Sequence, residues 1–463
     1  MTEASSTDSA SPDVLVIGAG QAGLCAALAA AQQGATVTVL EKRSLPGGST
    51  AMSSGLSAYA GTDEQAAAGI VDSVELLKKD ILETGKYKND EALVDAYCRE
   101  QLATYRWLKG LGVRYGEPHA ASGQTVPRSH GTDPSAMIDT LTKRAREAGV
   151  ALVTQTRAIQ LLTENGKVVG AQVERHGSVT DVRAGAVVLA SGGFSRSPEL
   201  LERFAPDMAK ALPGGSPGSE GDGLLMAWAI GADFRDTPYI KGTFGIYSEP
   251  DPRESGTGIL AVYKGAIAVN SAGRRFANES LPYKEIGDAC LAQPGAIGYQ
   301  IFDQRVMDAD DPSVEIYWFS GRLATGLLLK ADTLTGLANQ IGAPADELTR
   351  TVEAYNAAAR GEQPDEQGRT TLTGGYGTPF PLDHPPYYAH PSTTVVLATY
   401  CGLTITPDTN VLNVFGEVIE GLYAAGELTG GLHGAGYVTG TSVGKAGIFG
   451  RLAGLAAADY ARR

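Results

Sequence analysis

The sequence has little positive charge and few cysteines, and each shortage argues against a class of function. The 38 lysines and arginines are outnumbered by 52 aspartates and glutamates, which gives a formal net charge of -14. Nucleic acids and anionic membranes bind concentrated basic faces, so we expect neither as a partner. The four cysteines are spread along the chain without paired spacing, which disfavours a disulfide framework or a metal site and favours a reducing cytoplasm.

Long apolar runs are also missing. No segment approaches the about 18 to 20 apolar residues of a membrane span, so none is expected. The N-terminal stretch MTEASSTDSASPD lacks the basic residues and apolar core of a secretory signal. We interpret residues 1–12 as a disordered tail and expect a cytoplasmic protein.

The order of the apolar segments predicts an α/β protein with two domains. A strand at residues 13–17, a helix at 22–32 and a strand at 36–40 form the start of a Rossmann-like layer. Strands at 151–162, 168–175 and 186–190 are expected to extend that layer. The chain end returns to a strand, a glycine-rich turn and a helix over residues 422–458.

The middle of the chain differs from this pattern. Residues 238–398 combine short strands, proline-bearing loops and two amphipathic helical segments, which predicts an inserted α+β capping domain. Residues 13–237 and 399–463 would then form the cofactor-binding domain. The charged, glycine-rich segment 360–377 is expected to be a flexible return to it.

A dinucleotide fingerprint follows the first predicted strand. Gly18, Gly20 and Gly23 form GxGxxG at the opening of a helix, and Glu41 ends the next strand. In this pattern the glycines give a tight turn, bare backbone at the pyrophosphate and close helix packing, while the acidic residue accepts from ribose hydroxyls.

Two further loops favour FAD over a nicotinamide cofactor. After Glu41 and Lys42 the chain runs through a polar, glycine-rich loop where a nicotinamide enzyme would start another helix. Near the end of the chain, Glu427 follows a strand, where it would reach ribityl hydroxyls. The full set of residues expected to bind FAD is Gly18, Gly20, Gly23, Glu41, Lys42, Gly48, Ser49, Thr50, Gly55, Ala158, Asp222, Glu427, Ser442 and Val443.

The segments GAGQAG, EKRSLPGGST, SEGDG, GRRFANES and GLYAAGELTGG together resemble the fumarate reductase and 3-ketosteroid dehydrogenase family of flavoproteins. The resemblance covers nearly the whole chain. It implies that FAD lies across a Rossmann-like domain and that the capping domain closes over the flavin ring.

The reactive positions resemble the ketosteroid dehydrogenase branch. Where fumarate reductases carry a proton-donating arginine, the segment NESLPY has Tyr283, and GAGYVTG has Tyr437 where they carry a second arginine. A histidine of the fumarate reductases is also absent from the segment 397–402. Both dicarboxylate-clamping positions are therefore lost.

Desaturation beside a ketone needs a base for the α proton and a donor for the enolate oxygen. We assign Tyr283 as the base and Tyr437 as the donor, helped by a backbone amide from residues 439–442. Tyr283 would need a pKa lowered from about 10, which predicts an alkaline optimum. Tyr105 or Tyr115 is a possible counterpart of an additional active-site tyrosine in the steroid enzymes, whereas His130 and His433 are expected to be structural.

Substrate and acceptor stay open from sequence. The substrate is a 3-ketosteroid or a monocyclic ketone such as cyclohexanone or 4-oxocyclohexanecarboxylate, and Arg128, Lys284 or Arg253 would anchor a carboxylate. The electron acceptor is oxygen or a quinone. The alternatives are a fumarate-type reductase of a small unsaturated carboxylate and a non-catalytic electron-transfer flavoprotein.

Overall fold

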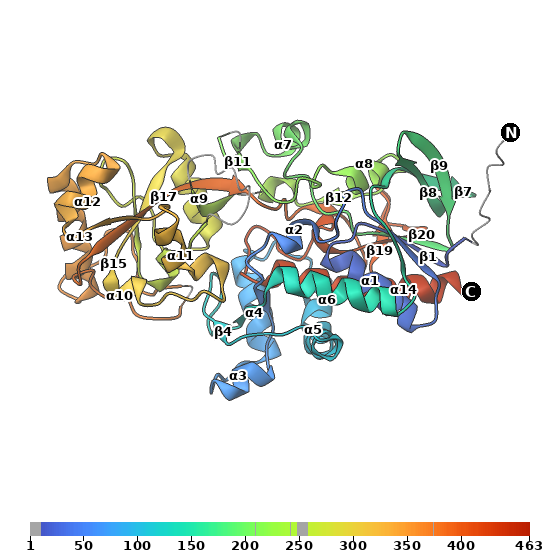
Figure 1. Cartoon of the computed structure of the whole chain (residues 1–463), viewed down its shortest axis with the longest axis horizontal. Coiled ribbons are helices and arrows are strands. Elements are labelled where there is room, and N and C mark those ends of the chain that lie inside the picture. Colours follow the sequence, from blue (N-terminus) through green and yellow to red (C-terminus); the bar gives the residue numbers. More distant parts are fainter. Residues whose placement is uncertain (1–10, 209, 241, 248–257, 374) are drawn as a thin grey trace.

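The computed structural model describes residues 11–208, 210–240, 242–247, 258–373 and 375–463. The molecule is elongated, with a sheet containing β1 at one end and a sheet containing β17 at the other (Figure 1). Most of the expected N-terminal tail lies outside the described residues. Pro12 at its end accepts a hydrogen bond from the Gly185 amide, so the last residue of the expected tail already contacts the fold.

The first sheet is the expected Rossmann-like layer. Its strands are parallel except β19, and in order they are β19 (Asn410–Leu412), β20 (Val418–Ala424), β10 (Ala186–Leu189), β1 (Val14–Ile17), β2 (Val37–Leu40) and β6 (Ala151–Val153). Strands β1 and β10 consist of four apolar residues each, all buried, as expected of a parallel sheet covered on both faces. The last strand, β20, brings the chain end back beside the first segments.

Two helices of this part touch backbone to backbone. Helix α1 (Gln21–Gln32) packs against α14 (Thr441–Ala461), the last helix. A Cβ at Gly450 would lie 2.4 Å from the Ala22 carbonyl oxygen, and one at Gly454 would lie 2.0 Å from that of Ala26. Glycine at these positions therefore lets the helices approach closely, which fixes α1 beneath the GxGxxG turn.

Other helices surround this layer. They are α2 (Gly48–Ala51), α3 (Asp63–Ala67), α4 (Val74–Thr84), α5 (Glu91–Leu111), α6 (Pro134–Glu147), α7 (Pro198–Phe204) and α8 (Asp222–Trp228). Small pairings join β3 (Ser57–Ala58), β5 (Ser129–His130) and β4 (Pro118–His119), and also β12 (Phe234–Arg235) with β18 (Gly402–Leu403).

The expected extension of the layer is wrong for two of its segments. The predicted strand at 151–162 is two strands, because the chain turns at Gln155, whose φ is 52°. Only β6 joins the parallel sheet. The rest forms a separate antiparallel sheet of β7 (Arg157–Glu164), β8 (Lys167–Arg175) and β9 (Ser178–Arg183).

The other end of the molecule is a mixed sheet with helices, which we call the capping part. Its long central strand β17 (Tyr387–Val396) pairs with β11 (Leu212–Pro213), β13 (Thr243–Tyr247), β15 (Gly298–Asp303) and β16 (Leu329–Ala331), and β14 (Ile267–Val269) pairs with β15. Its helices are α9 (Tyr283–Leu291), α10 (Gln304–Met307), α11 (Phe319–Ala324), α12 (Leu334–Ile341) and α13 (Ala345–Ala359).

Each end has its own apolar core, but the cores do not follow the expected domain limits at every residue. Leu56, Tyr400 and Tyr437 belong by sequence to the cofactor-binding segments, yet they pack in the core of the capping part. The return segment 360–377 is not a loose connection where it is described. Arg369 is buried there and donates to the carbonyls of Val262 and Ala266.

None of the helices in the described ranges combines the length and apolar character that a membrane crossing requires.

Candidate functional site

A cavity of about 610 Å³ runs between the two parts of the molecule. One end reaches the GxGxxG turn and the other reaches Tyr283 and Tyr437. The cavity therefore connects the predicted cofactor-binding residues with the two predicted catalytic tyrosines. Expected cofactor residues that line it are Gly18, Gly20, Glu41, Lys42, Gly48, Ser49, Thr50, Ala158, Asp222, Glu427, Ser442 and Val443.

The glycines of the fingerprint have separable roles. Gly18 has a φ of 106°, and a Cβ there would lie 2.4 Å from the Ala190 carbonyl oxygen. A Cβ at Gly23 would lie 1.9 Å from the Gly18 oxygen, so this residue seats the helix on the turn and does not line the cavity. Gly20 faces the open space, where only the Gly47 oxygen comes within 3.7 Å of an added Cβ. The backbone at Gly20 is thus accessible to a ligand.

Gly55 is the other expected cofactor residue that does not line the cavity. A Cβ there would lie 1.9 Å from the Thr132 carbonyl oxygen, and its φ is 68°. Gly55 shapes the loop behind the cavity through its backbone.

Charged residues gather at the fingerprint end. The Glu41 carboxylate accepts from the amides of Ala19 at 3.0 Å and Arg43 at 2.8 Å, which fixes it at the end of β2. Lys42 donates to Asp222 at 2.6 Å, and Asp222 also accepts from Arg157 at 2.6 Å. The expected residues Lys42 and Asp222 therefore form an ion pair across the cavity wall.

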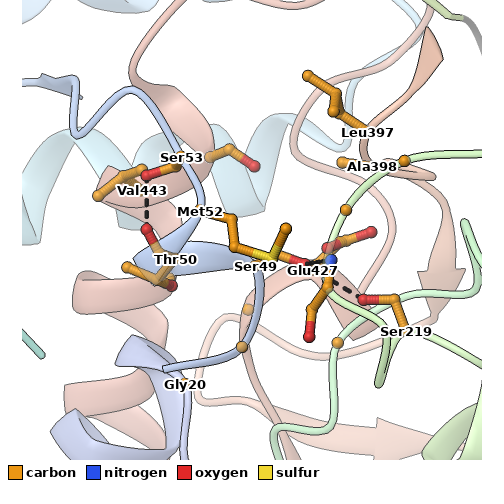
Figure 2. A pocket seen from close by; sticks show the side chains of 18 of the residues that line it. Gly20, Ser49, Thr50, Met52, Ser53, Ser219, Leu397, Ala398, Glu427 and Val443 are labelled. Atoms are coloured by element: carbon orange, nitrogen blue, oxygen red, sulfur yellow. Dashed lines mark hydrogen bonds between the residues drawn. The ribbon is translucent and has the colours of Figure 1, made fainter. Parts of the chain in front are cut away.

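Polar side chains from distant segments meet in the middle of the cavity (Figure 2). Ser49 and Ser219 share a hydrogen bond of 3.2 Å, and Ser53 donates to the Thr50 carbonyl at 2.8 Å. Gln21 and the Ser191 hydroxyl line the same space, are buried, and have no hydrogen-bond partner among the described residues. Because buried polar atoms are nearly always paired, these groups fit contacts to a polar ligand.

Glu427 is half-buried and lines the cavity, and sequence reasoning missed its surroundings. Its carboxylate accepts from the Thr399 amide at 3.0 Å, and burial raises its pKa. Lys445 of α14 is buried nearby, donates to the Thr429 carbonyl, and has a pKa lowered to about 8 by burial. No local motif marks Thr399 or Lys445, because only tertiary packing brings them to Glu427.

The two predicted tyrosines meet at the capping end of the cavity. The rings of Tyr283, the first residue of α9, and Tyr437, in the loop before α14, pack edge to face with centroids 5.8 Å apart. The Tyr437 oxygen accepts from the Gly440 amide at 3.2 Å, beside the N-terminus of α14. The hydroxyl hydrogen of Tyr437 remains available for a ligand, and the accepted bond makes that hydrogen a stronger donor.

The expected helper amide is already used. The Thr439 and Thr441 amides donate to the carbonyls of Ser122 and Val438. The Gly440 and Ser442 amides are directed at the Tyr437 oxygen, whose pKa their hydrogen bonds lower against the larger opposing effect of burial. These amides support the phenol and do not form a second donor.

The expected lowered pKa of Tyr283 is also wrong. Burial raises the pKa of Tyr283 well above 10, and the neighbouring phenols of Tyr400 and Tyr437 raise it further. Dense packing of phenols in an apolar site disfavours each phenolate.

Tyr400 is a site residue that sequence reasoning missed as an active group. Its ring centroid lies 4.8 Å from that of Tyr437 and 5.2 Å from that of His433, and it lines the cavity. The sequence showed only that histidine is absent from this segment. Tyr400 comes to the site because β17 delivers the chain there, which no local pattern records.

Other residues considered from sequence lie elsewhere. Tyr105 and Tyr115 pack with Tyr59 and His130 in an aromatic cluster away from the cavity. His130 shares a hydrogen bond of 2.8 Å with the Arg128 carbonyl, which suits the structural role expected of it.

The three proposed carboxylate anchors also differ from expectation. Arg128 is fully buried and paired with Asp72 and Asp80, so it is wrong as an anchor. Lys284 lies on the face of the Tyr400 ring, with Nζ 3.6 Å from its centroid. Arg253 lies outside the described residues.

Comparison with known proteins decides the family. Residues 13–443 match the family model described as FAD binding domain. The chain belongs to this FAD-binding family. The chain is similar to a urocanate reductase of Eggerthella lenta, with 34% identity over 464 residues, which cover 97% of this chain and 75% of that protein. A probable fumarate reductase Ifc3 of Shewanella frigidimarina is 32% identical over 458 residues, again 97% and 75%.

A solved structure of the same fold is that of a ketosteroid dehydrogenase. The 3-ketosteroid-delta4-(5alpha)-dehydrogenase of Rhodococcus jostii RHA1, in complex with 4-androstene-3,17-dione, superposes with a TM-score of 0.76 at 27% identity, covering 98% of this chain and 99% of that one. Membership of the FAD-binding family, together with these relatives, makes the chain an FAD-dependent oxidoreductase. The glycine turn, the unpartnered Gln21 and Ser191 and the length of the cavity fit this cofactor.

Proposed function

We propose that the chain desaturates a cyclic ketone at the carbon–carbon bond next to its carbonyl, and that FAD accepts the hydride. The observation that carries this proposal is the packing of Tyr283, Tyr400 and Tyr437 at the capping end of the cavity. Phenols donate to and take protons from neutral carbonyl compounds, whereas a dicarboxylate needs fixed positive charge.

The rest of the capping wall supports a neutral substrate. Among the described cavity-lining residues of the capping part, Glu315 is the one charged side chain, and it pairs with Arg322. Its neighbours are apolar, including Phe244, Ile259 and Leu260. A carboxylate at this end would be poorly solvated, and Glu315, already paired with Arg322, offers it no positive charge.

Each phenol has a distinct task in this proposal. Tyr437, polarised by the Gly440 amide, donates to the ketone oxygen and stabilises the enolate. Tyr283 takes the α proton, since it lines the same end of the cavity and its ring packs edge to face against that of Tyr437. FAD, when bound along the fingerprint, supplies the hydride acceptor for the β carbon. The acceptor that reoxidises it is proposed to be oxygen or a quinone.

A second candidate is reduction of a small unsaturated acid, because the relatives named above include reductases of fumarate and urocanate. Hydride transfer between a flavin and a carbon–carbon bond also runs in the direction of reduction. The tyrosines and Glu315 weigh against it, since none of the described cavity-lining residues of the capping part is a cation. Lys284 does not line the cavity and lies against the Tyr400 ring. The dehydrogenase of Rhodococcus jostii shows that this fold also serves ketone desaturation.

The test is anaerobic mixing of the oxidised enzyme with a 5α-3-ketosteroid, cyclohexanone or 4-oxocyclohexanecarboxylate. We expect one of these ketones to bleach the flavin and to yield the α,β-unsaturated ketone by mass spectrometry. In parallel, dithionite-reduced enzyme is mixed with fumarate and urocanate. Reoxidation by either acid, with no bleaching by any ketone, would replace the desaturase proposal with the reductase.

A further inference from the structure

We propose that Lys284 and Tyr400 form a pair that stabilises negative charge on the phenols of this site, so that Tyr283 can accept the substrate's α proton. This inference rests on the proposed desaturase function. It assigns a positioning residue, Lys284, and a third phenol, Tyr400, to the reaction.

The backbone at Tyr400 indicates that its position is held by its surroundings. Tyr400 has a φ of 56°, in the left-handed region that bulky residues rarely adopt, and it is buried. Such a conformation is strained and persists only where packing fixes it, most often at active sites. Here it directs the ring against Tyr437 at the end of the cavity.

Lys284 is placed where helix stability would disfavour it. It is the second residue of α9, and its side chain is only 3% exposed. A cation near a helix N-terminus opposes the helix dipole, and a buried ammonium is poorly solvated. Two of its described contacts are aromatic: Nζ lies 3.6 Å from the centroid of the Tyr400 ring and 5.9 Å from that of the Tyr437 ring.

The contact acts more strongly on a phenolate than on a phenol. An ammonium over an aromatic face is attracted by the ring's negative π surface, and ionisation of the hydroxyl adds negative charge to that ring. An opposite charge within about 4 to 6 Å moves a pKa by about 1 to 3 units toward the charged form. Burial is the largest cause that raises the pKa of Tyr400 and of Tyr283. In this proposal the charge of Lys284, in contact with the Tyr400 ring, acts in the opposite direction.

The hydroxyls carry this effect to the base. Hydrogen bonding with Tyr283 lowers the pKa of Tyr400, which burial raises, and the same contact raises the pKa of Tyr283. Before reaction, one proton leaves the pair to solvent, and the charge rests mainly on Tyr400 beside Lys284. When the substrate C–H bond breaks, its electron pair stays on the enolate and the proton neutralises the Tyr283–Tyr400 pair.

Other titratable groups also face Tyr400. Tyr437 and His433 come from the loop before α14, and Glu427 comes from η6 (Gly426–Leu428), whose charge raises the pKa of Tyr400. Lys284 is the cation in direct contact with the ring among these described neighbours.

The test combines a substrate-free titration with kinetics. FAD-loaded enzyme labelled at the tyrosine Cζ atoms is titrated by carbon NMR, and the pH dependence of flavin reduction is measured. Lys284→Met removes the charge and keeps the chain length. We expect the pKa of Tyr400 to increase by about one unit or more. The pH at which the rate of flavin reduction rises should increase by the same amount.

A matched control is available in the same part of the protein. Lys264 lies over the Tyr317 ring, with Nζ 4.3 Å from the centroid, and neither residue lines the cavity. Lys264→Met should leave the Tyr400 titration and the rate profile unchanged. If it moves them equally, the effect is general and the assignment to Lys284 is wrong.

The outcomes separate this inference from the function on which it rests. A Tyr400 titration that is the same in wild type and Lys284→Met overturns the pair, whatever the substrate. If no ketone reduces the flavin, the desaturase proposal fails. The titration still tests whether Lys284 lowers the pKa of Tyr400. Should Lys284→Met lose FAD, Tyr400→Phe replaces it. We then expect the pH at which the rate of flavin reduction rises to increase by a similar amount. If that pH does not change, the inference is contradicted.

Discussion

At the scale of single residues, the oxygen of Tyr437 determines what the capping end of the cavity can do. It accepts an amide hydrogen from Gly440 and keeps its own hydrogen for a ligand. A phenol held in this way acts as a preorganised donor, and the loss of one such donor typically lowers the rate about 100- to 1,000-fold.

Tyr437→Phe is therefore expected to lower the rate of anaerobic flavin reduction by about 100-fold or more. FAD should stay bound, because the phenyl ring still packs against Tyr400. Stopped-flow absorbance measures the rate, and the visible spectrum measures the FAD content. Tyr355→Phe is the control, since it removes a buried hydroxyl of the capping core that has no partner in the described structure. Wild-type reduction by the Tyr437 variant would rule out the donor role.

Residue-level prediction from sequence worked where a motif carries the chemistry. Tyr283 and Tyr437 stand in short segments that resemble a family pattern, and the structure brings both to one cavity. Tyr400 and Lys445 stand in no such pattern. Their roles depend on contacts between segments far apart in the chain, and on burial, which also reversed the expected pKa of Tyr283.

At the scale of elements, helices α1 and α14 connect the chain end to the fingerprint. Their close approach depends on Gly450 and Gly454, whose added Cβ atoms would collide with carbonyl oxygens of α1. Because α1 starts at the GxGxxG turn, its displacement would also move the bare backbone at Gly20.

Gly454→Ala should consequently destabilise the protein by about 1 to 3 kcal/mol, as overpacking usually does. We expect a lower Tm by differential scanning calorimetry and weaker retention of FAD on dilution. Gly110→Ala is the matched control, since this glycine also lies in a helix but nothing comes within 4 Å of its added Cβ. An unchanged Tm for Gly454→Ala would show that the helices separate without loss.

Strand and helix patterns predicted the Rossmann-like layer well, because its buried strands and GxGxxG turn are local in sequence. The division at Gln155 was missed, since a residue with positive φ other than glycine leaves no compositional signal. The membership of Tyr400 and Tyr437 in the capping core was missed for a related reason, as core membership is a tertiary property.

At the scale of the whole molecule, three histidines with lowered pKa contribute to the response of stability to acid: His130 and His433, which are buried, and His119, which is half-buried. Burial lowers the pKa of His119, His130 and His433 from 6.5. Below that value the unfolded chain binds protons at these residues that the folded chain does not. The free energy of unfolding therefore decreases as the pH falls from 6.5.

We expect the Tm of the wild type to fall between pH 6.5 and about pH 5, before most carboxylates titrate. His130→Gln should reduce this slope, even if its Tm at neutral pH is lower. His176→Gln serves as the control, because that side chain is exposed on a turn. A slope for His130→Gln equal to that of the wild type would show that other groups bind the protons.

Strand β17 gives the molecule one further property. It spans the capping sheet, ends at Val396, and passes within a few residues into the strained position of Tyr400. Any movement of the capping part would therefore displace Tyr400 through the short peptide segment that joins it to β17. If the cavity opened in this way, the phenols would be out of alignment. A form of the site that is open to water would then be unable to carry out the reaction.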